Sequence, residues 1–452
     1  HVGALMTFKL PSDAPPDFVR KLMLQMREKP FMPEPFGYRL ARGRLARVAP
    51  AWEETTVDME YHMRHSALPY PGGERELGVL VARMHSHPLD LSRPLWECHL
   101  IEGLEGNRFA LYFKAHHCAI DGMGAMKMVQ KWLSPDPDDR SGIVGPWMVA
   151  ARPPPETGDG EDRWARFRKP VRAAAEQARG LKELVRVIAK MTRGADSGTR
   201  ASLATPRSMF NVNISQQRRL GTQILDLARI KAIGEKTASS ANDVLLAVCA
   251  GAIRRYLIEQ KALPEKSLLA SVPVGLPRPD GKSGNAVAGF VVPLGTDITD
   301  PAERLAQINR VTTRSKQELM ELPQAGLMQF ALLGLAPLLL SQVTGLGARM
   351  PPIFNFTMSN VVLSKHPLYL MGAELEAMYP VSFLLDGYGL NITLVGYRDR
   401  VAIGVLGCRD AIPSLQRLAI YTTDALAELE EAVGVVPRKP VKLKRRKPAP
   451  AA

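Results

Sequence analysis

The chain has 452 residues, of which 46% are hydrophobic and 23% are charged. This hydrophobic share excludes a chain that is disordered as a whole, and the length is enough for two cores of ordinary domain size. The four cysteines have neither CxxC spacing nor the density of a secreted scaffold: Cys98, Cys118, Cys249 and Cys408. We therefore expect a reducing cytoplasm and no disulfide framework or zinc site.

The formal net charge is +14. A basic balance of this size usually suggests nucleic acid, but no nucleic-acid motif accompanies it, so we expect no nucleic-acid partner. Part of the excess lies in a tail that contains the run KLKRRK and ends in PAPAA. Its composition is typical of a solvated, disordered arm. Such an arm either attracts the protein to an anionic membrane surface or only keeps it soluble.

The first informative motif along the chain is Pro94-Leu95-Trp96. Proline is tolerated at the start of a strand, and Trp96 and Leu100 would then pack in the core. We therefore expect a substitution of Trp96 to act mainly by destabilising the fold. The nearby histidines lack the spacing of metal ligands, so no metal is expected: His85, His87 and His99.

The next motif joins a predicted strand to a predicted helix. The run FALYFKA over 109–115 is typical of a buried strand, and apolar residues three and four apart after Gly122 indicate one face of a helix. Between them lie His116, His117 and Asp121. Reactive side chains often project from loops that rigid elements hold in place.

Each part of this loop has an ordinary structural explanation, because a histidine at a strand end is usually a polar rim residue and Asp-Gly is usually a turn. The combination of a histidine pair, an aspartate four residues after the second histidine and an adjacent glycine is much rarer. It favours catalysis, with His117 as the general base. Cys118 lies inside the motif, but a thiol nucleophile needs a base across the site, so we interpret this cysteine as a filler.

Proline, glycine and aspartate crowd 134–170, which is the signature of a linker. A helix is predicted over 171–191, and the second half starts near Pro206. We therefore divide the chain into a first lobe (1–150), a linker with a crossover helix (151–205), a second lobe (206–435) and the basic tail (436–452).

The second lobe is predicted to mix strands and helices. Strands are expected at 267–276 and 286–296, a helix at 302–322, and a hairpin from 390–397 and 401–408. The segment 326–348 has no charged residue and is long enough to span a membrane, but Pro337 and several polar residues interrupt it. We predict a buried or interfacial helix there, which would pack in the core, line an acyl tunnel or touch a bilayer.

Asn242 and Asp243 precede a long apolar stripe and therefore mark a helix start. Ser240 with Asp243 approximates a capping box, and an acidic group favours the positive end of the helix dipole. This favours a structural role for Asp243. Asn242 has two readings, because its amide either donates to a developing oxyanion or only completes the helix start.

The sequence HHCAIDG matches the HHxxxDG signature of acyltransferases that share the architecture of chloramphenicol acetyltransferase and condensation domains. Together with PLW at 94–96 and ND at 242–243, the chain resembles the bacterial wax ester synthase/diacylglycerol acyltransferase family over nearly its whole length. Two features depart from that family. Ser359-Asn360-Val361 is followed by VLS, where the family usually has a Pro-Gly turn. The first residue is His1 and not Met, so we expect further residues to precede it.

The resemblance implies an α/β fold with two chloramphenicol-acetyltransferase-like lobes around a central substrate channel. It implies transfer of a fatty acyl group from acyl-CoA, a co-substrate rather than a cofactor, to a fatty alcohol or diacylglycerol. His117 would be the base, His116 would position it, and Asp121 would brace the loop through an arginine. Gly122 would permit the turn and a close approach of the thioester. The protein would lie at the cytoplasmic membrane face or on lipid inclusions.

Two other functions remain open at this point. A condensation-type enzyme would use a thioester tethered to a carrier, although PLW and ND argue against it. A lipid-inclusion binding protein would need only the basic tail and the uncharged segment, although His117 and Asp121 are intact.

Overall fold

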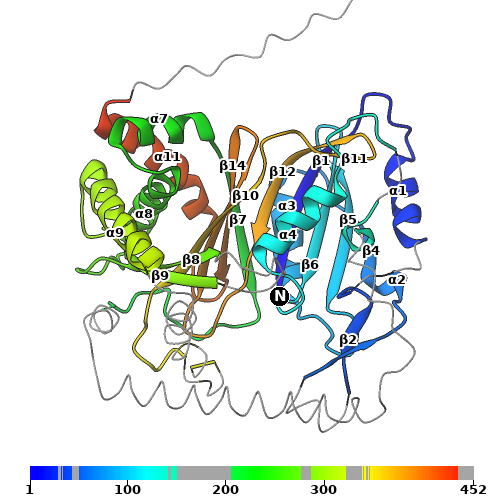
Figure 1. The fold of residues 1–452 in the computed structure, drawn as a ribbon, viewed down its shortest axis with the longest axis horizontal. Helices are drawn as coiled ribbons and strands as arrows, with labels where there is room; N and C mark the ends of the chain where they lie inside the picture. Colours follow the sequence, from blue (N-terminus) through cyan, green and yellow to red (C-terminus); the bar gives the residue numbers. More distant parts are fainter. Residues whose placement is uncertain are drawn as a thin grey trace, which may run out of the picture.

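The computed structural model describes residues 1–28, 32, 34–42, 50–140, 144–149, 205–275, 287–321, 338, 341–342, 345 and 347–435. Within these residues the strands form two six-stranded sheets and a two-stranded ribbon, and helices lie on both sides of the strands (Figure 1). The ribbon pairs β2 (Tyr38–Leu40) with β3 (Trp52–Glu54).

The first sheet takes most of its strands from the first half of the chain. Its order is β11-β12-β1-β6-β5-β4. The strands are β11 (Tyr369–Leu370), β12 (Ala373–Val381), β1 (Val2–Lys9), β6 (Arg108–Ala115), β5 (Trp96–Leu104) and β4 (Met63–Ala67). The second half of the chain therefore contributes β11 and β12 to a sheet that is otherwise built by the first half. The predicted division into lobes at 150 and 206 stays a prediction.

The second sheet is built entirely from the second half of the chain. Its order is β7-β14-β13-β10-β8-β9. The strands are β7 (Arg218–Asp226), β14 (Arg400–Cys408), β13 (Leu390–Tyr397), β10 (Phe356–Ser364), β8 (Leu269–Gly275) and β9 (Val287–Pro293). Neighbouring β13 and β14 form the predicted hairpin, which confirms that prediction.

Strand β1 lies between β6 and β12 and pairs antiparallel with both. Gly3 is opposite Lys114 of β6 on one side and Val381 of β12 on the other. Because both neighbours run against β1, they run parallel to each other and end at the same edge of the sheet. The segments that follow Ala115 and Val381 therefore leave the sheet side by side.

The helices of the second half cover the outer face of the second sheet. They are α7 (Leu227–Thr237), α8 (Ala241–Glu259), α9 (Pro301–Glu321) and α11 (Gln416–Val433), grouped on the left in Figure 1. Helix α8 is apolar on almost all sides, because α7, α9 and α11 enclose it. The long apolar stripe after Asn242 thus forms the centre of this layer.

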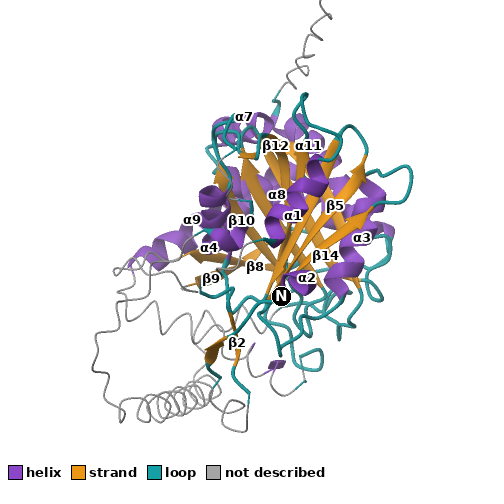
Figure 2. Ribbon diagram, turned by 90° about the vertical axis from the view of Figure 1, so that its right-hand side faces the viewer, coloured by secondary structure: helices purple, strands orange, loops and turns teal. Residues whose placement is uncertain are grey.

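The first sheet has a different core on each face. On the outer face pack α1 (Phe18–Arg27), which lies in front of the strands in Figure 2, and α4 (Gly122–Trp132), with the short helix η2 (Pro146–Met148). On the inner face packs α3 (Glu74–Ser86), which also contacts β7 of the second sheet. A short helix, α2 (Met59–His62), precedes β4.

The two sheets meet where α3, β12 and β14 pack together. Leu77 and Val81 of α3 share a buried cluster with Ala402 and Leu406 of β14. A Cβ added at Gly404 would overlap the carbonyl oxygen of Pro380 in β12, so glycine is required for this close approach of backbones. The apolar core is therefore continuous between the sheets.

Several predicted elements are confirmed with small changes of their bounds. These are the strand at 109–115 (β6), the helix after Gly122 (α4), the strands at 267–276 and 286–296 (β8 and β9) and the helix at 302–322 (α9). Where a Pro-Gly turn is usual after Val361, strand β10 continues to Ser364. The predicted helix at 171–191 and the basic tail lie outside the described residues.

The uncharged segment 326–348 lies mostly outside the described residues as well. Of its described members, Leu338 is buried with Phe354 and Tyr388, and Ser341 is also buried. Among the residues that the structure describes, no helix is long and apolar enough to cross a membrane.

Trp96 is fully buried in a stack of aromatic rings. His62 and Trp147 both stack on it, with ring centroids 4.7 and 4.8 Å away. The indole Nε1 donates a hydrogen bond to the Phe36 carbonyl at 3.0 Å. The PLW motif therefore anchors the outer core of the first sheet.

A buried group of charged residues joins β5, β6 and the end of α3. Lys114 Nζ lies 3.1 Å from Glu97 Oε2 and donates to the carbonyls of Met84 and His87 at 3.3 and 3.2 Å. Burial alone would raise the pKa of Glu97, but the hydrogen bond from His99 and the charges of Lys114 and Arg64 lower it to about 2. The carboxylate thus stays ionised inside the protein.

We expect Trp96→Ala to lower the free energy of unfolding by about 3–5 kcal/mol, because it leaves a cavity in the aromatic stack. Trp96→Phe keeps a ring there but leaves the Phe36 carbonyl unsatisfied, so it should cost about 1–3 kcal/mol. Urea unfolding of both variants measures this. A Trp96→Ala protein that is as stable as the wild type would show that the aromatic stack does not stabilise the fold.

The Glu97 carboxylate has a depressed pKa in the folded protein, so its contribution to stability is present above its ordinary pKa of 4.5 and is lost as the pH falls toward about 2. The contribution amounts to about 3 kcal/mol at about 1.4 kcal/mol for each pKa unit. The double variant Glu97→Gln/Lys114→Met lacks this titration. The difference in unfolding free energy between wild type and double variant should therefore fall on acidification through this range.

The two single variants provide the control for that measurement. Glu97→Gln leaves the buried Lys114 ammonium without its carboxylate, and Lys114→Met leaves the buried Glu97 carboxylate with only Arg64 at 3.7 Å and His99 at 3.3 Å, so each should be less stable at neutral pH than the double variant. The buried ion pair would be contradicted by single variants that are as stable as the double variant. It would also be contradicted if the difference in unfolding free energy between wild type and double variant did not change with pH.

Candidate active site

The HHxxxDG loop connects the end of β6 with the start of α4. The His116 amide donates to the Leu95 carbonyl at 2.9 Å, and the Ala119 amide donates to the His116 carbonyl at 2.9 Å. The first bond attaches the loop to the PLW motif, and the second closes a turn around His117. These two hydrogen bonds therefore fix the backbone around His117.

His117 is half-buried and faces a residue from the other half of the chain. Its ring meets the Phe383 ring edge to face, with centroids 5.1 Å apart and an interplanar angle of 84°. Phe383 belongs to the segment that leaves β12 at Val381. The parallel exits of β6 and β12 thus bring His117 and Phe383 together at the junction of the two sheets.

His116 has a neutral imidazole whose protonation follows from its contacts. Nδ1 accepts a hydrogen bond from the Cys118 amide at 3.3 Å, so the ring proton lies on Nε2. Burial lowers the pKa of His116, and a positive charge on the neighbouring His117 ring would lower it further. His116 is therefore a fixed neighbour of His117 that does not take up a proton readily.

The thiol of Cys118 contacts an imidazole, that of His116, although the sequence did not indicate a base beside this cysteine. Its Sγ lies 3.0 Å from Nδ1 of His116. Burial raises the pKa of this thiol, and the neutral ring beside it supplies no positive charge to stabilise a thiolate. These contacts favour an unreactive thiol, in agreement with the interpretation of Cys118 as a filler.

Asp121 caps helix α4. Its Oδ1 accepts a hydrogen bond from the Gly124 amide at 2.5 Å, and its backbone carbonyl accepts from Ala125. The arginine expected to brace Asp121 does not occur among its contacts in the described part of the chain. The aspartate instead fixes the loop by starting the helix, as an acidic N-cap does.

Gly122 is the first residue of α4, and its backbone does not require glycine. Its φ is not in the left-handed region, and a Cβ added there would meet nothing within 4 Å. The expectation that Gly122 permits the turn is therefore not supported. The open space beside Gly122 is compatible with its other expected role, which is to let the substrate come close to the backbone.

Asn242 and Asp243 lie at the start of α8, and Asp243 has a structural role. Its carboxylate accepts from the Ser240 amide and hydroxyl at 3.0 and 2.6 Å, and from the Thr312 hydroxyl at 2.7 Å. These bonds confirm the predicted capping box and tie α8 to α9. Helix α8 packs against α7, α9 and α11, and no described contact joins Asn242 to His117.

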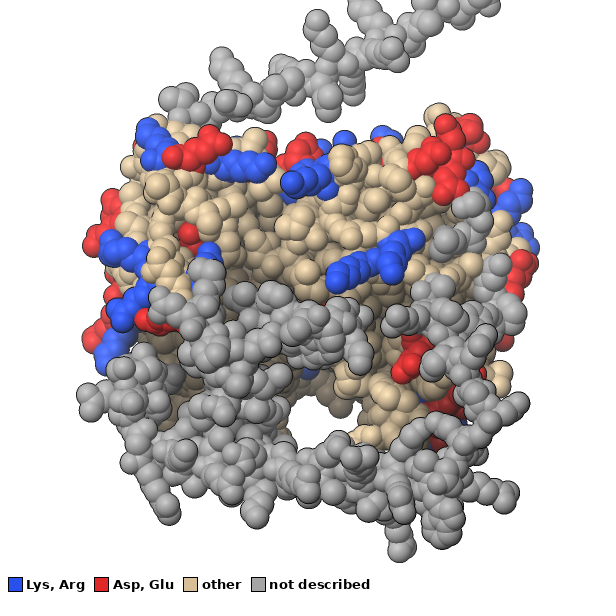
Figure 3. Space-filling model, viewed as in Figure 1, with Lys and Arg blue, Asp and Glu red and all other residues tan. Residues whose placement is uncertain are grey.

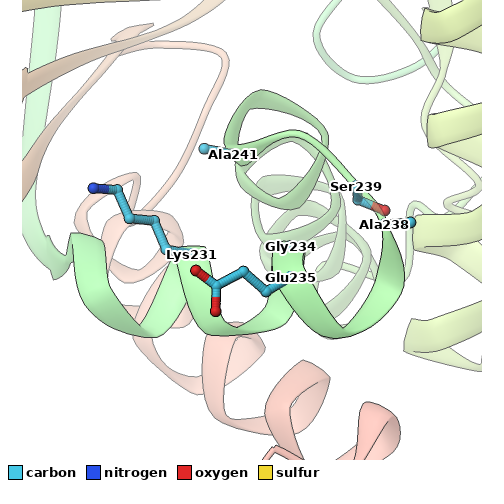
Figure 4. A pocket seen from close by; sticks show the side chains of 6 residues that line it. All are labelled: Lys231, Gly234, Glu235, Ala238, Ser239 and Ala241. Carbon is cyan, nitrogen blue, oxygen red and sulfur yellow. The ribbon is translucent and has the colours of Figure 1, made fainter.

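A surface cavity of about 300 Å³ lies at the turn between α7 and α8 (Figure 4). Its lining contains none of the predicted site residues and consists of Lys231, Gly234, Glu235, Ala238, Ser239 and Ala241. In the described ranges, no group of three or more His, Cys, Asp or Glu side chains is arranged to hold a metal ion. His85 and His99 are instead buried and hydrogen-bonded within the core.

Sequence reasoning identified the loop but missed its partner. Phe383 is a single aromatic residue in a segment without a motif, and no local signal connects it to His117. The contact arises only because β12 pairs with β1 on the side opposite β6. The pattern of the second half alone would assign β12 to the second sheet.

Two family models match the chain. Residues 1–245 match the wax ester synthase/diacylglycerol acyltransferase catalytic domain, and residues 283–430 match the WS/DGAT C-terminal domain. A putative diacylglycerol O-acyltransferase of Mycobacterium tuberculosis is 48% identical over 96% of this chain and 95% of its own length. The O-acyltransferase WSD of Acinetobacter baylyi is 34% identical over 96% and 93%.

Solved structures also resemble this chain. The wax ester synthase/diacylglycerol acyltransferase of Marinobacter aquaeolei is 38% identical and superposes with a TM-score of 0.78, covering 96% of this chain and 95% of that chain. A condensation domain of the calcium-dependent antibiotic synthetase, 17% identical with a TM-score of 0.55 over 96% and 91%, shares the fold. The expected two-lobed α/β fold is thereby confirmed. The chain is an acyltransferase that belongs to the wax ester synthase/diacylglycerol acyltransferase family.

Proposed function

We propose that the protein transfers a long-chain acyl group from acyl-CoA to a fatty alcohol, to diacylglycerol or to both. His117 is the general base, and no acyl-enzyme intermediate forms. The observation that carries this proposal is the half-buried imidazole of His117 at the junction of the two sheets, held by the turn behind it and by Phe383 beside it.

One imidazole serves both proton transfers of this reaction. His117 takes the proton of the alcohol as its oxygen attacks the thioester carbonyl. A C–O bond forms, the C–S bond breaks, and the same proton passes from His117 to the departing CoA thiolate. The products are an ester and free CoA, and the imidazole is neutral again.

The other loop residues support this base without taking part in the proton transfer. The fixed, neutral ring of His116 adds no fixed positive charge beside His117. The Asp121 cap holds the start of α4. The open space at Gly122 gives the thioester room to approach. Asn242 has no step in this mechanism.

Two observations support these substrates, namely the names of the relatives and the charge on the surface beside the loop. The relatives are named as diacylglycerol O-acyltransferases and as a wax ester synthase. In Figure 3 a positively charged patch lies over α4 in a largely uncharged part of this face, and the exposed lysines of that helix are Lys127 and Lys131. Positive charge next to the catalytic loop suits the phosphates of CoA. The basic tail, by the same argument, favours peripheral contact with an anionic lipid surface.

The purified protein should form ester from palmitoyl-CoA with hexadecanol or a diacylglycerol, and His117→Ala should lower that rate by at least about 100-fold. Release of free thiol and the ester product are measured together, and circular dichroism confirms that the variant is folded. His65→Ala is the matched control, because His65 is exposed and its ionic partner among the described residues is Glu102, 3.6 Å away.

Ester formation at equal rates by the wild type and folded His117→Ala would overturn the assignment of the base. Binding of lipid without any ester from either protein would favour the non-catalytic alternative. Faster transfer from a carrier-tethered thioester than from acyl-CoA would favour a condensation-type donor.

A further inference from the structure

His85 is a buried histidine that the proposed mechanism does not use. It lies in the last turn of α3 and is 2% exposed. Its Nδ1 is 2.6 Å from the Tyr112 hydroxyl in β6, and its Nε2 is 2.7 Å from the Ser382 carbonyl. One side chain thus connects α3, the strand before the catalytic loop and the segment that carries Phe383.

The roles of the two ring nitrogens follow from these partners. The Ser382 carbonyl can only accept, so Nε2 carries the proton and donates it. Nδ1 of the neutral ring is then an acceptor for the Tyr112 hydroxyl. Burial lowers the pKa of His85 to about 3, so this neutral form persists at any pH at which the protein works.

The bond to Ser382 acts on the first residue after β12. Strand β12 ends at Val381, and Phe383 is the next residue after Ser382. Beyond Val381 no pairing with β1 holds the backbone. The hydrogen bond from His85 instead holds the carbonyl of the next residue, Ser382. Phe383 then meets the His117 ring edge to face.

We propose that His85 is a positioning residue for acyl transfer: it holds the Ser382 carbonyl and thereby keeps Phe383 against the ring of His117. The inference rests on the proposed function of His117. Without this hydrogen bond, Phe383 loses its fixed position against the ring, and the packing that helps to hold the imidazole in the geometry for proton transfer is lost.

The position of α3 does not depend on His85 alone. The Ser86 hydroxyl accepts from the Arg218 amide at 2.8 Å, and Lys114 binds the carbonyls at the end of the helix. Loss of the His85 side chain therefore leaves α3 attached to both sheets. This separates a positioning role from a general role in folding.

Two substitutions separate the two bonds of His85. The amide nitrogen of Gln reaches approximately where Nε2 lies, so His85→Gln keeps the donor to Ser382. Asn reaches only the position of Nδ1, so His85→Asn loses that donor. We expect His85→Asn to lower kcat by about tenfold or more with little change in KM, and His85→Gln to retain kcat within about threefold.

His62 provides a matched control. It is equally buried and bonds the Trp96 carbonyl through Nδ1 at 2.7 Å, and the partners of its ring in the described part of the chain are Tyr61 and Trp96, not the segment of Phe383. His62→Gln should lower the unfolding temperature and leave the kcat of the folded protein unchanged. A fall in kcat with His85→Asn that only matches the fall in folded fraction would mark His85 as structural.

Phe383→Ala completes the test. If His85 acts through Phe383, then His85→Asn/Phe383→Ala should lower kcat no further than the more impaired single variant. Multiplicative effects, or equal kcat values for His85→Gln and His85→Asn, would overturn the proposal. Full activity of His117→Ala in the same assay would instead refute the proposed base, so the two failures are distinguishable.

Discussion

The central constraint in this molecule is the position of β1 between β6 and β12. Antiparallel pairing on both sides makes its two neighbours parallel, and opposite Gly3 stand Lys114 and Val381. Two segments from distant parts of the sequence therefore leave the sheet at one edge. One of them carries His117 and the other carries Phe383. The contact between His117 and Phe383, on which the proposed catalytic site is built, follows from this pairing.

Buried polar contacts around the end of α3 hold that junction. An unpaired polar group in the core costs free energy, and at the end of α3 two buried side chains have such partners: Lys114 pairs with Glu97, and His85 bonds Tyr112 and Ser382. These bonds are directional, whereas the apolar contacts between α3, β7 and β14 are not. The apolar core thus supplies affinity between the sheets, and the polar contacts fix the loop geometry.

The elements were predictable from sequence where the pattern is local. FALYFKA gave a strand, spacing gave α4, and Ser240 with Asp243 gave the helix cap. The contact of the HHxxxDG loop with Phe383 was not predictable, because pairing of β12 with β1 decides it and no local signal marks this pairing. The arginine expected beside Asp121 came from the family resemblance alone. The turn expected at Gly122 also had a local signal in Asp-Gly, but the structure begins helix α4 at this residue instead.

The claim that most needs a direct test is single-step transfer by His117, since the thiol of Cys118 lies 3.0 Å from the ring of His116 in the same loop. Intact-protein mass spectrometry after mixing the enzyme with palmitoyl-CoA, without any acceptor alcohol, distinguishes the two mechanisms. Direct transfer predicts an unchanged protein mass and ester only after alcohol is added. An acyl adduct on Cys118 that forms as fast as turnover and passes to the added alcohol would contradict the account.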